Sequence, residues 1–251
     1  MEENSVGQSI RMFLAAIVAL VVVVGAFLAF KGKSDENGNP DNPENGVSVG
    51  SGTFSEEDVA AAGTRLVAAV RAGDITSAAA FLDEGDNPNE PGIDGSTALN
   101  TALAFNNSEM AQLLLNRGAD PNVPALDGYF PIHRAVVNGD VGVVAQIAQS
   151  GVDLNSRVQT TGQTALMLAA AGNRIEMISV LAGWNADATL TDSAGDNALH
   201  IALLNGASNP EVYSFLIQAG ADPNALGSQG KSAIELATEA GLTDVLAALQ
   251  G

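Results

Sequence analysis

The chain has 251 residues and a formal net charge of −19 at pH 7, from 29 acidic and 10 basic side chains. So acidic a chain repels nucleic acid phosphates, which argues against DNA or RNA binding. It contains no cysteine, which excludes disulfides, thiolate nucleophiles and cysteine-ligated zinc. Aromatic residues make up 4% of the chain against 46% hydrophobic residues in total, and a core of small aliphatic side chains favours packed helices over a β-sandwich.

An uncharged hydrophobic run follows a short N-terminal tail of residues 1–11. It covers residues 12–30, and its 19 residues read MFLAAIVALVVVVGAFLAF. As a helix rising about 1.5 Å per residue, this run matches the roughly 30 Å hydrocarbon core of a bilayer. A cleaved signal peptide is the other interpretation, but the tail carries two glutamates and Phe30 and Lys31 end the run without the small residues of a cleavage site. The run therefore predicts an uncleaved transmembrane helix.

The next segment, residues 31–53, is rich in Gly, Asn, Asp, Pro and Ser. It offers almost nothing to bury, so we expect a flexible acidic linker. From residue 54 the composition changes to alternating short helical segments, and residues 54–251 are expected to form one folded domain.

Two short phrases recur throughout residues 54–251. An Asp-x-Asn turn phrase recurs every 33 to 35 residues, and a phrase of the Gly-x-Thr kind follows each copy at a nearly fixed distance. Self-similarity with a period near 33 indicates a solenoid. The copies of the turn phrase are residues 86–89, 119–122, 152–155, 186–189 and 221–224, and those of the second phrase are residues 95–99, 128–133, 162–166, 195–200 and 230–234.

Each unit reads as a pair of helices. A side-chain oxygen at the second phrase can cap a small, alanine-rich first helix by accepting from free backbone N–H groups. A second helix follows, and it ends at a residue that tolerates the left-handed conformation. The expected caps at the start of the first helix are Thr97, Thr164, Asn197 and Ser232, and the expected ends of the second helix are Gly118, Gly151, Asn185 and Gly220.

These phrases resemble the ankyrin repeat family over about residues 54–251. Residues 130–133, Phe-Pro-Ile-His, are closest to the family's Thr-Pro-Leu-His phrase, and residues 118–122 show its Gly-Ala-Asp-Pro-Asn ending. The resemblance implies an all-α ankyrin-repeat solenoid of about six antiparallel helix pairs with projecting hairpin-like loops, to which the N-terminal transmembrane helix is added. The first unit, from Phe54, and the last, from Gly230, look like caps. Two extra residues around 207–210 should lengthen the loop between the two helices of the fifth unit.

Residues that could carry chemistry recur with the repeat. His133 and His200 occupy the histidine position of the phrase, for which the resemblance implies a bond to the loop backbone of the neighbouring repeat. Regular recurrence also explains the turn aspartates without acid–base catalysis or calcium binding. We therefore expect no catalytic residue, no metal site and no cofactor. The alternative is an ankyrin-bearing enzyme, or a protein that binds a small ligand or a cation on its acidic face.

In the family the recognition surface consists of the loop tips and the exposed side of the first helix. Mapping these positions onto the chain places apolar residues mainly in the second and third units, and exposed apolar patches mark partner sites. The predicted partner-binding residues are Phe105, Leu126, Tyr129, Val137, Asn138 and the lone tryptophan, Trp184. Other mapped positions are Ile93, Asp94, Ser96, Asp127, Thr160, Thr161, Gln163, Asp196 and Leu204. Two alternatives stay open: Phe105 and Tyr129 cover each other, and Trp184 packs on the neighbouring loop.

The predicted function is that of a non-catalytic scaffold or adaptor, held at a membrane and binding a partner protein. The membrane orientation is predicted by comparing the number of basic side chains on the two sides of the span. Arg11 precedes the span and Lys31 and Lys33 follow it, so the counts differ by only one. The literal count places the repeats in the cytoplasm. Three observations favour the opposite side. The span follows a short N-terminal tail, as in signal anchors, the acidic segment after it dilutes the two lysines, and the absence of cysteine suits an oxidising compartment. We therefore expect a bacterial inner-membrane protein with its repeats in the periplasm.

Overall fold

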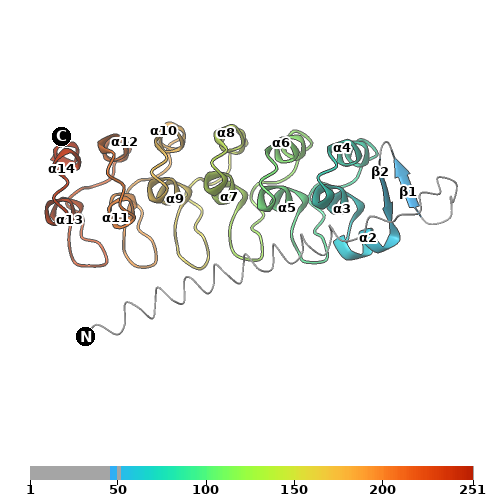
Figure 1. Ribbon diagram of the computed structural model, residues 1–251, viewed down its shortest axis with the longest axis horizontal. Helices are drawn as coiled ribbons and strands as arrows, with labels where there is room; N and C mark the ends of the chain where they lie inside the picture. The colour runs from blue at the N-terminus through green and yellow to red at the C-terminus, as the bar shows by residue number, and fades with distance from the viewer. Residues whose placement is uncertain (1–45, 50–51, 251) are drawn as a thin grey trace. The chain divides into compact units, whose positions relative to one another are not determined.

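The repeats form two parallel rows of helices. The computed structural model describes residues 46–49 and 52–250, and six helix pairs follow one another along them (Figure 1). The first helices of the pairs pack side by side in one row and the second helices in the other. The pairs are α3 (Arg65–Ala72) and α4 (Ile75–Asp83), α5 (Ala98–Ala104) and α6 (Ser108–Asn116), α7 (Pro131–Asn138) and α8 (Val141–Gln149), α9 (Ala165–Ala171) and α10 (Ile175–Gly183), α11 (Ala198–Leu204) and α12 (Pro210–Gln218), and α13 (Ala233–Glu239) and α14 (Thr243–Gln250).

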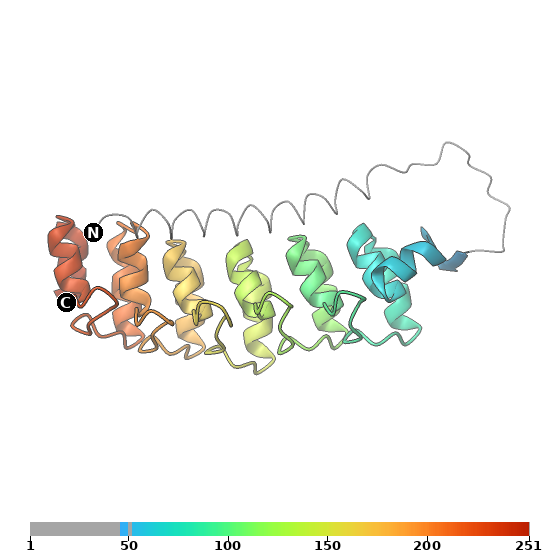
Figure 2. The same ribbon diagram turned by 90° about the horizontal axis from the view of Figure 1, so that it is seen from below.

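We number these pairs repeats one to six. The loops that join successive repeats project on the side of the first helices, and they lie next to one another when the stack is viewed from that side (Figure 2). The connection between α11 and α12 is longer than the other connections within a pair, as the extra residues of the fifth unit predicted. The all-helical solenoid expected for the repeats is confirmed.

The N-terminal side of repeat one carries structure that the sequence did not predict. Strands β1 (Gly46–Val49) and β2 (Gly52–Ser55) form an antiparallel hairpin in which Val47 pairs with Phe54. A thirteenth described helix, α2 (Glu56–Ala62), follows directly and begins with a capping box between Ser55 and Asp58. The boundary expected at residue 54 therefore falls inside β2, and the end of the expected linker is a strand pair. Gly and Asn residues around a four-residue strand obscure its alternation.

The predicted transmembrane helix, residues 12–30, lies outside the described residues. Within the described residues, no helix combines the length and the apolar character needed to cross a membrane.

Local interactions start and end the helices at the expected residues. Thr97, Thr164, Asn197 and Ser232 each accept from a backbone N–H in the first turn of their helix. At the other end, Gly118 has φ of +86° and Asn185 has φ of +62°, the left-handed conformation that ends a helix without a steric penalty at glycine. Because all these bonds join residues close in sequence, the sequence pattern was sufficient to predict them.

One apolar core runs along the whole stack, from Phe54 to Leu249. The second helices of repeats one to five each contribute a large, fully buried side chain at the same position of the repeat, and these are Phe81, Leu114, Ile147, Leu181 and Leu216. The first helices bury alanines such as Ala98, Ala135 and Ala165. Alanine lets neighbouring helix axes approach closely, so adjacent repeats exclude water from their contact.

Hydrogen bonds across the repeat boundary hold each loop in place. His133 donates from Nε2 to the carbonyl oxygen of Ser156 at 3.0 Å, and Nε2 of His200 lies 3.1 Å from the carbonyl oxygen of Lys231. Asn100 takes the histidine position in repeat two and donates to the Val123 carbonyl at 2.9 Å. The structural role expected for both histidines is thus confirmed, and in repeat two an asparagine fulfils it.

We expect Leu114→Ala to lower the free energy of unfolding by about 2–5 kcal/mol, because it leaves a cavity where a fully buried side chain was. Chemical denaturation measures this loss. Leu126→Ala is the matched control: its side chain is exposed on a loop tip, so its effect should stay within about 0.5 kcal/mol. Equal effects of the two substitutions would show that α6 does not face the core.

A second prediction concerns His133. Burial lowers the pKa of its imidazole from 6.5 to about 4, and Nδ1 must stay unprotonated to accept from the Phe130 N–H at 3.1 Å. Because the folded pKa lies below the unfolded value, the unfolded chain takes up the proton first. Stability is therefore lost as pH falls from 6.5 towards 4, at up to about 1.4 kcal/mol per pH unit.

His133→Asn tests this loss, since the asparagine at position 100 shows that the repeat accepts that residue. The variant should lose less stability than the unaltered chain between pH 6.5 and 4.5 in denaturation curves. The fold lowers the pKa values of the Asp187 and Glu235 carboxyl groups from their ordinary values of 3.8 and 4.5. The stability that these two groups contribute is therefore lost mainly below that pH window. The same pH dependence in both proteins would contradict the assignment.

Candidate functional site

Four large apolar side chains are exposed on repeats two and three and their loops. Ile93 and Leu126 lie on successive loop tips and are 71% and 77% exposed. A methyl group added at Gly95 would come within 3.4 Å of Leu126, so the two tips are neighbours. We call Ile93 and Leu126 the tip pair.

Phe105 and Val137 lie at the other end of the first helices. Phe105 is the residue that ends α5 and is 41% exposed, and Val137 lies in the last turn of α7 and is 49% exposed. The Asn138 amide donates to the Leu103 carbonyl at 2.7 Å and ties these two helix ends together. We call Phe105 and Val137 the turn pair, because each precedes the short turn into the second helix of its repeat.

Two predicted recognition residues are already engaged within the chain. Tyr129 is half-buried, with its ring 5.3 Å from the guanidinium carbon of Arg134 and 6.2 Å from the ring of His133. Arg134 in turn forms an ion pair with Asp127. Asn138 is half-buried, and its side-chain amide already donates to the Leu103 carbonyl of repeat two. The aromatic neighbour of Tyr129 is His133 and not Phe105, so the rings of Phe105 and Tyr129 do not cover each other.

Trp184 ends α10, a helix of the second row, and is 46% exposed. The turn pair belongs to first-row helices, so Trp184 does not extend that pair along the row. Leu204, at the end of α11, is exposed as mapped. Leu226, on the loop before repeat six, is also exposed, and the sequence did not single it out. The feature of the sequence that could have indicated its exposure is a leucine next to a glycine in a polar loop.

The prediction that Asp196 lies on an exposed loop tip is wrong. In the structure its carboxylate is buried and accepts from the Ser228 N–H at 2.8 Å and from the Ser228 hydroxyl at 2.6 Å. It joins the loop of repeat five to that of repeat six. Sequence proximity to a tip could not reveal a partner 32 positions away.

The recurring aspartates build turns. Asp120 and Asp153 accept from the backbone N–H groups two residues later at 2.8 and 2.9 Å, and Asp187 does the same with Thr189. The hydroxyl and N–H of Thr189 lower the pKa of Asp187. Nowhere in residues 46–49 or 52–250 do three or more His, Asp or Glu side chains gather as a metal site would require. These carboxylates therefore act as local hydrogen-bond acceptors in the fold.

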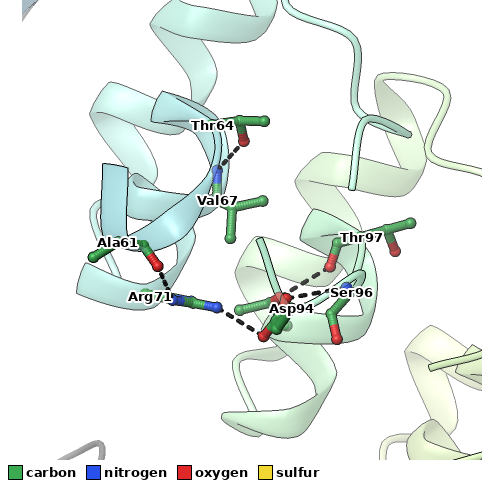
Figure 3. A network of polar contacts seen from close by, with 8 residues as sticks. Ala61, Thr64, Val67, Arg71, Asp94, Ser96 and Thr97 are labelled. Carbon is green, nitrogen blue, oxygen red and sulfur yellow. Dashed lines mark hydrogen bonds and ion pairs between the residues drawn. The ribbon is translucent and has the colours of Figure 1, made fainter. Parts of the chain in front are cut away.

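Every basic side chain of the described residues has an acceptor within the chain. Arg71 is typical: it donates to the Ala61 carbonyl at 3.1 Å and pairs with Asp94 at 2.7 Å (Figure 3). It thereby joins α2 to the tip that carries Ile93. Arg65, Arg117, Arg134 and Lys231 also pair with carboxylates, whereas Arg157 and Arg174 donate to backbone carbonyls.

Carboxylates far outnumber these bases, by 23 to seven in residues 54–250. Exposed carboxylates recur in the first turn of the second helices, at Glu109, Glu176, Glu211 and Asp244. A shallow hollow of about 400 Å³ lies near the turn pair, and its polar side chains are Asn106, Ser108, Asn138, Asp140 and Glu176. This end of repeats two to four therefore presents apolar side chains beside negative charge.

Solved structures similar to this chain are ankyrin repeat proteins. An ankyrin repeat domain from Acinetobacter baumannii matches with a TM-score of 0.70 and 26% identity, over 74% of this chain and 95% of that chain. The ankyrin repeat domain of Bcl-3, described as a unique member of the IkappaB protein family, matches with a TM-score of 0.65 and 22% identity, over 75% and 82% of the two chains. The second likeness concerns the fold alone.

Similar curated proteins are much longer than this chain. The ankyrin repeat and KH domain-containing protein mask-1 of Caenorhabditis elegans is 36% identical over 86 residues, which is 34% of this chain and 3% of that protein. The E3 ubiquitin-protein ligase KEG of Arabidopsis thaliana is 32% identical over 98 residues, 39% of this chain and 6% of that protein. The similarity is thus confined to a small part of each relative.

The family model for ankyrin repeats matches three overlapping segments of this chain, residues 66–158, 132–227 and 166–250. These segments contain five of the six helix pairs completely and most of the first. Since they span well over half of its residues, the chain belongs to the ankyrin repeat family.

Proposed function

We propose that this chain is a non-catalytic adaptor that binds a partner protein through the tip pair and the turn pair. Ankyrin repeats typically mediate protein–protein interactions. The observation that supports this surface is the exposure of Ile93, Phe105, Leu126 and Val137 on adjacent repeats. Buried apolar contacts supply most of the binding energy in an interface, and aromatic side chains supply a large share of it.

The loops are suited to recognition because they are fixed before a partner binds. Arg71 holds the tip of Ile93 through Asp94, and Asn100 holds the segment before Leu126 through the Val123 carbonyl. A surface whose backbone is already ordered loses less conformational entropy on binding. The tip pair can therefore contribute to affinity without a folding step.

The membrane part of the proposal rests on the sequence. Residues 12–30 contain no charged side chain, and a stretch of that length and composition is typical of a single transmembrane helix. The repeats would then lie close to the bilayer, joined to it by the acidic segment that follows. We propose a bacterial inner-membrane protein with its repeats on the periplasmic side.

We expect Phe105→Ala and Leu126→Ala each to reduce partner capture about five- to thirtyfold, the range for a residue that contributes strongly to an interface. Neither should shift the melting temperature much, since both side chains are exposed. Capture is measured by cross-linking on native membranes followed by mass spectrometry. Leu226→Ala, an exposed leucine on the loop before repeat six, is the control and should bind normally. Unchanged capture by the two test variants would place the partner site elsewhere.

The orientation predicts protease sensitivity. When spheroplasts are treated with protease, the repeats should be degraded while a cytoplasmic marker survives, because this proposal places residues 31–251 on the periplasmic side of the inner membrane. Immunoblotting with an antibody against the repeats measures the result. Repeats that stay intact until detergent opens the membrane would place them in the cytoplasm instead.

A further inference from the structure

The turn pair and its charged surroundings carry information about the partner's chemistry. The hollow is lined by Asn106 and Asn138, which directly follow the exposed residues Phe105 and Val137 in the sequence. Asp140 and Glu176 contribute carboxylates to the hollow, and Glu109 is exposed in the first turn of α6. We call Phe105, Glu109, Val137, Asp140 and Glu176 the turn edge.

The carboxylates of the turn edge are not neutralised by the chain. Glu109, Asp140 and Glu176 take part in none of the ion pairs of the described residues. Arg174 is a cation next to the turn edge: its guanidinium donates to the Val137 carbonyl at 2.8 Å and lies against Gly139, so one positive charge stands beside these three carboxylates. The turn edge therefore keeps more negative than positive charge.

A simpler explanation accounts for part of this pattern. Acidic residues in the first turn of a helix interact favourably with its dipole, which is sufficient reason for Glu109 and Glu176, and Asp140 caps α8 by accepting from the Val143 N–H at 2.9 Å. It does not explain why two large apolar side chains are exposed beside them. Exposed apolar side chains next to a polar rim are the arrangement of a protein interface.

We infer that the turn edge binds an extended segment of the partner protein in which lysine or arginine residues alternate with apolar residues. This inference rests on the proposed function and adds the class of partner. The apolar side chains of the segment would contact Phe105 and Val137, and its cations would lie against Asp140, Glu176 and Glu109. Charge complementarity selects such a segment, because a carboxylate brought to this edge would be repelled.

The dimensions of the stack fit this occupant. Packed helices lie about 8–10 Å apart, and an extended chain advances about 3.3 Å per residue. A segment that runs from repeat two to repeat four therefore needs roughly six residues. Each repeat that it passes is matched by about three residues, enough for one apolar and one basic side chain.

Site-specific photo-cross-linking tests the inference with the full chain in its native membrane. Benzoylphenylalanine replaces Val137 in one protein and Ser179, an exposed residue of α10, in the control. We expect a cross-link from position 137 and little from position 179. Sequencing of the captured peptide should find at least two Lys or Arg residues and no net negative charge within about six residues of the attachment point.

Charge reversal then tests the carboxylates. Glu176→Lys should lower the yield from position 137 about three- to tenfold, and added NaCl should lower the yield of the unaltered protein, because exposed charge pairs are screened. Asp244→Lys is the matched control, since Asp244 takes the equivalent first-turn position in α14. Circular dichroism measures whether both variants fold. If the Glu176→Lys variant does not fold, Glu176→Gln provides a milder substitution.

The outcomes separate the two proposals. A specific cross-link from position 137 to an acidic or uncharged segment overturns this inference and leaves the proposed function standing. No cross-link at position 137, or equal yields at positions 137 and 179, overturns the proposed function and this inference with it. Equal losses from Glu176→Lys and Asp244→Lys show an effect of net charge alone and overturn the local site.

Discussion

The contact between neighbouring helix pairs is the interaction on which the rest of this structure depends. A single pair cannot bury its apolar face, so each repeat is stable only against the next one. Buried side chains such as Leu114, Ile147 and Leu181 recur at this contact. The two ends of the stack lack one neighbour. At the first end, Phe54 of the hairpin is buried against Phe81 with their ring centroids 6.0 Å apart, and α13 and α14 close the other end with few buried residues.

Polar bonds between repeats fix what this apolar contact leaves free. Apolar packing is not directional, whereas a hydrogen bond from His133 to the Ser156 carbonyl sets the position of one loop. Asn89 and Asn155 do the same by accepting from the N–H groups of Asp120 and Asp187 at 2.7 and 2.8 Å. The loops are thereby ordered without a sheet of their own. That order is what gives exposed side chains on the tips a defined position.

The use of charge follows from the same construction. The few basic residues of the repeats form bonds within a repeat, as Lys231 does with Glu239, or between neighbouring elements of the stack, as Arg71 does between α2 and Asp94. The carboxylates that remain give the surface a strong negative field, which steers positively charged molecules towards it. Acidic residues at helix starts and apolar residues at helix ends alternate along the turn side of the stack, so the surface is both anionic and locally apolar.

The repeat period, the helix caps and the turns were determined by the sequence by itself. Thr97, Asp153 and Gly118 act on backbone groups a few residues away, so their chemistry is visible in a short window. The hairpin of residues 46–55 was not visible, because its four-residue strands are stabilised by pairing with each other and by contact with α2, α3 and α4.

Only the tertiary structure decided which of the candidate recognition residues are free to meet a partner. Phe105, Leu126 and Val137 are exposed, whereas Asp196 and Asn138 bond to residues 32 and 35 positions away. Both groups occupy variable positions of the repeat and look alike in sequence. Exposure depends on what the neighbouring repeat places against a side chain, and that contact exists only once the repeats have stacked.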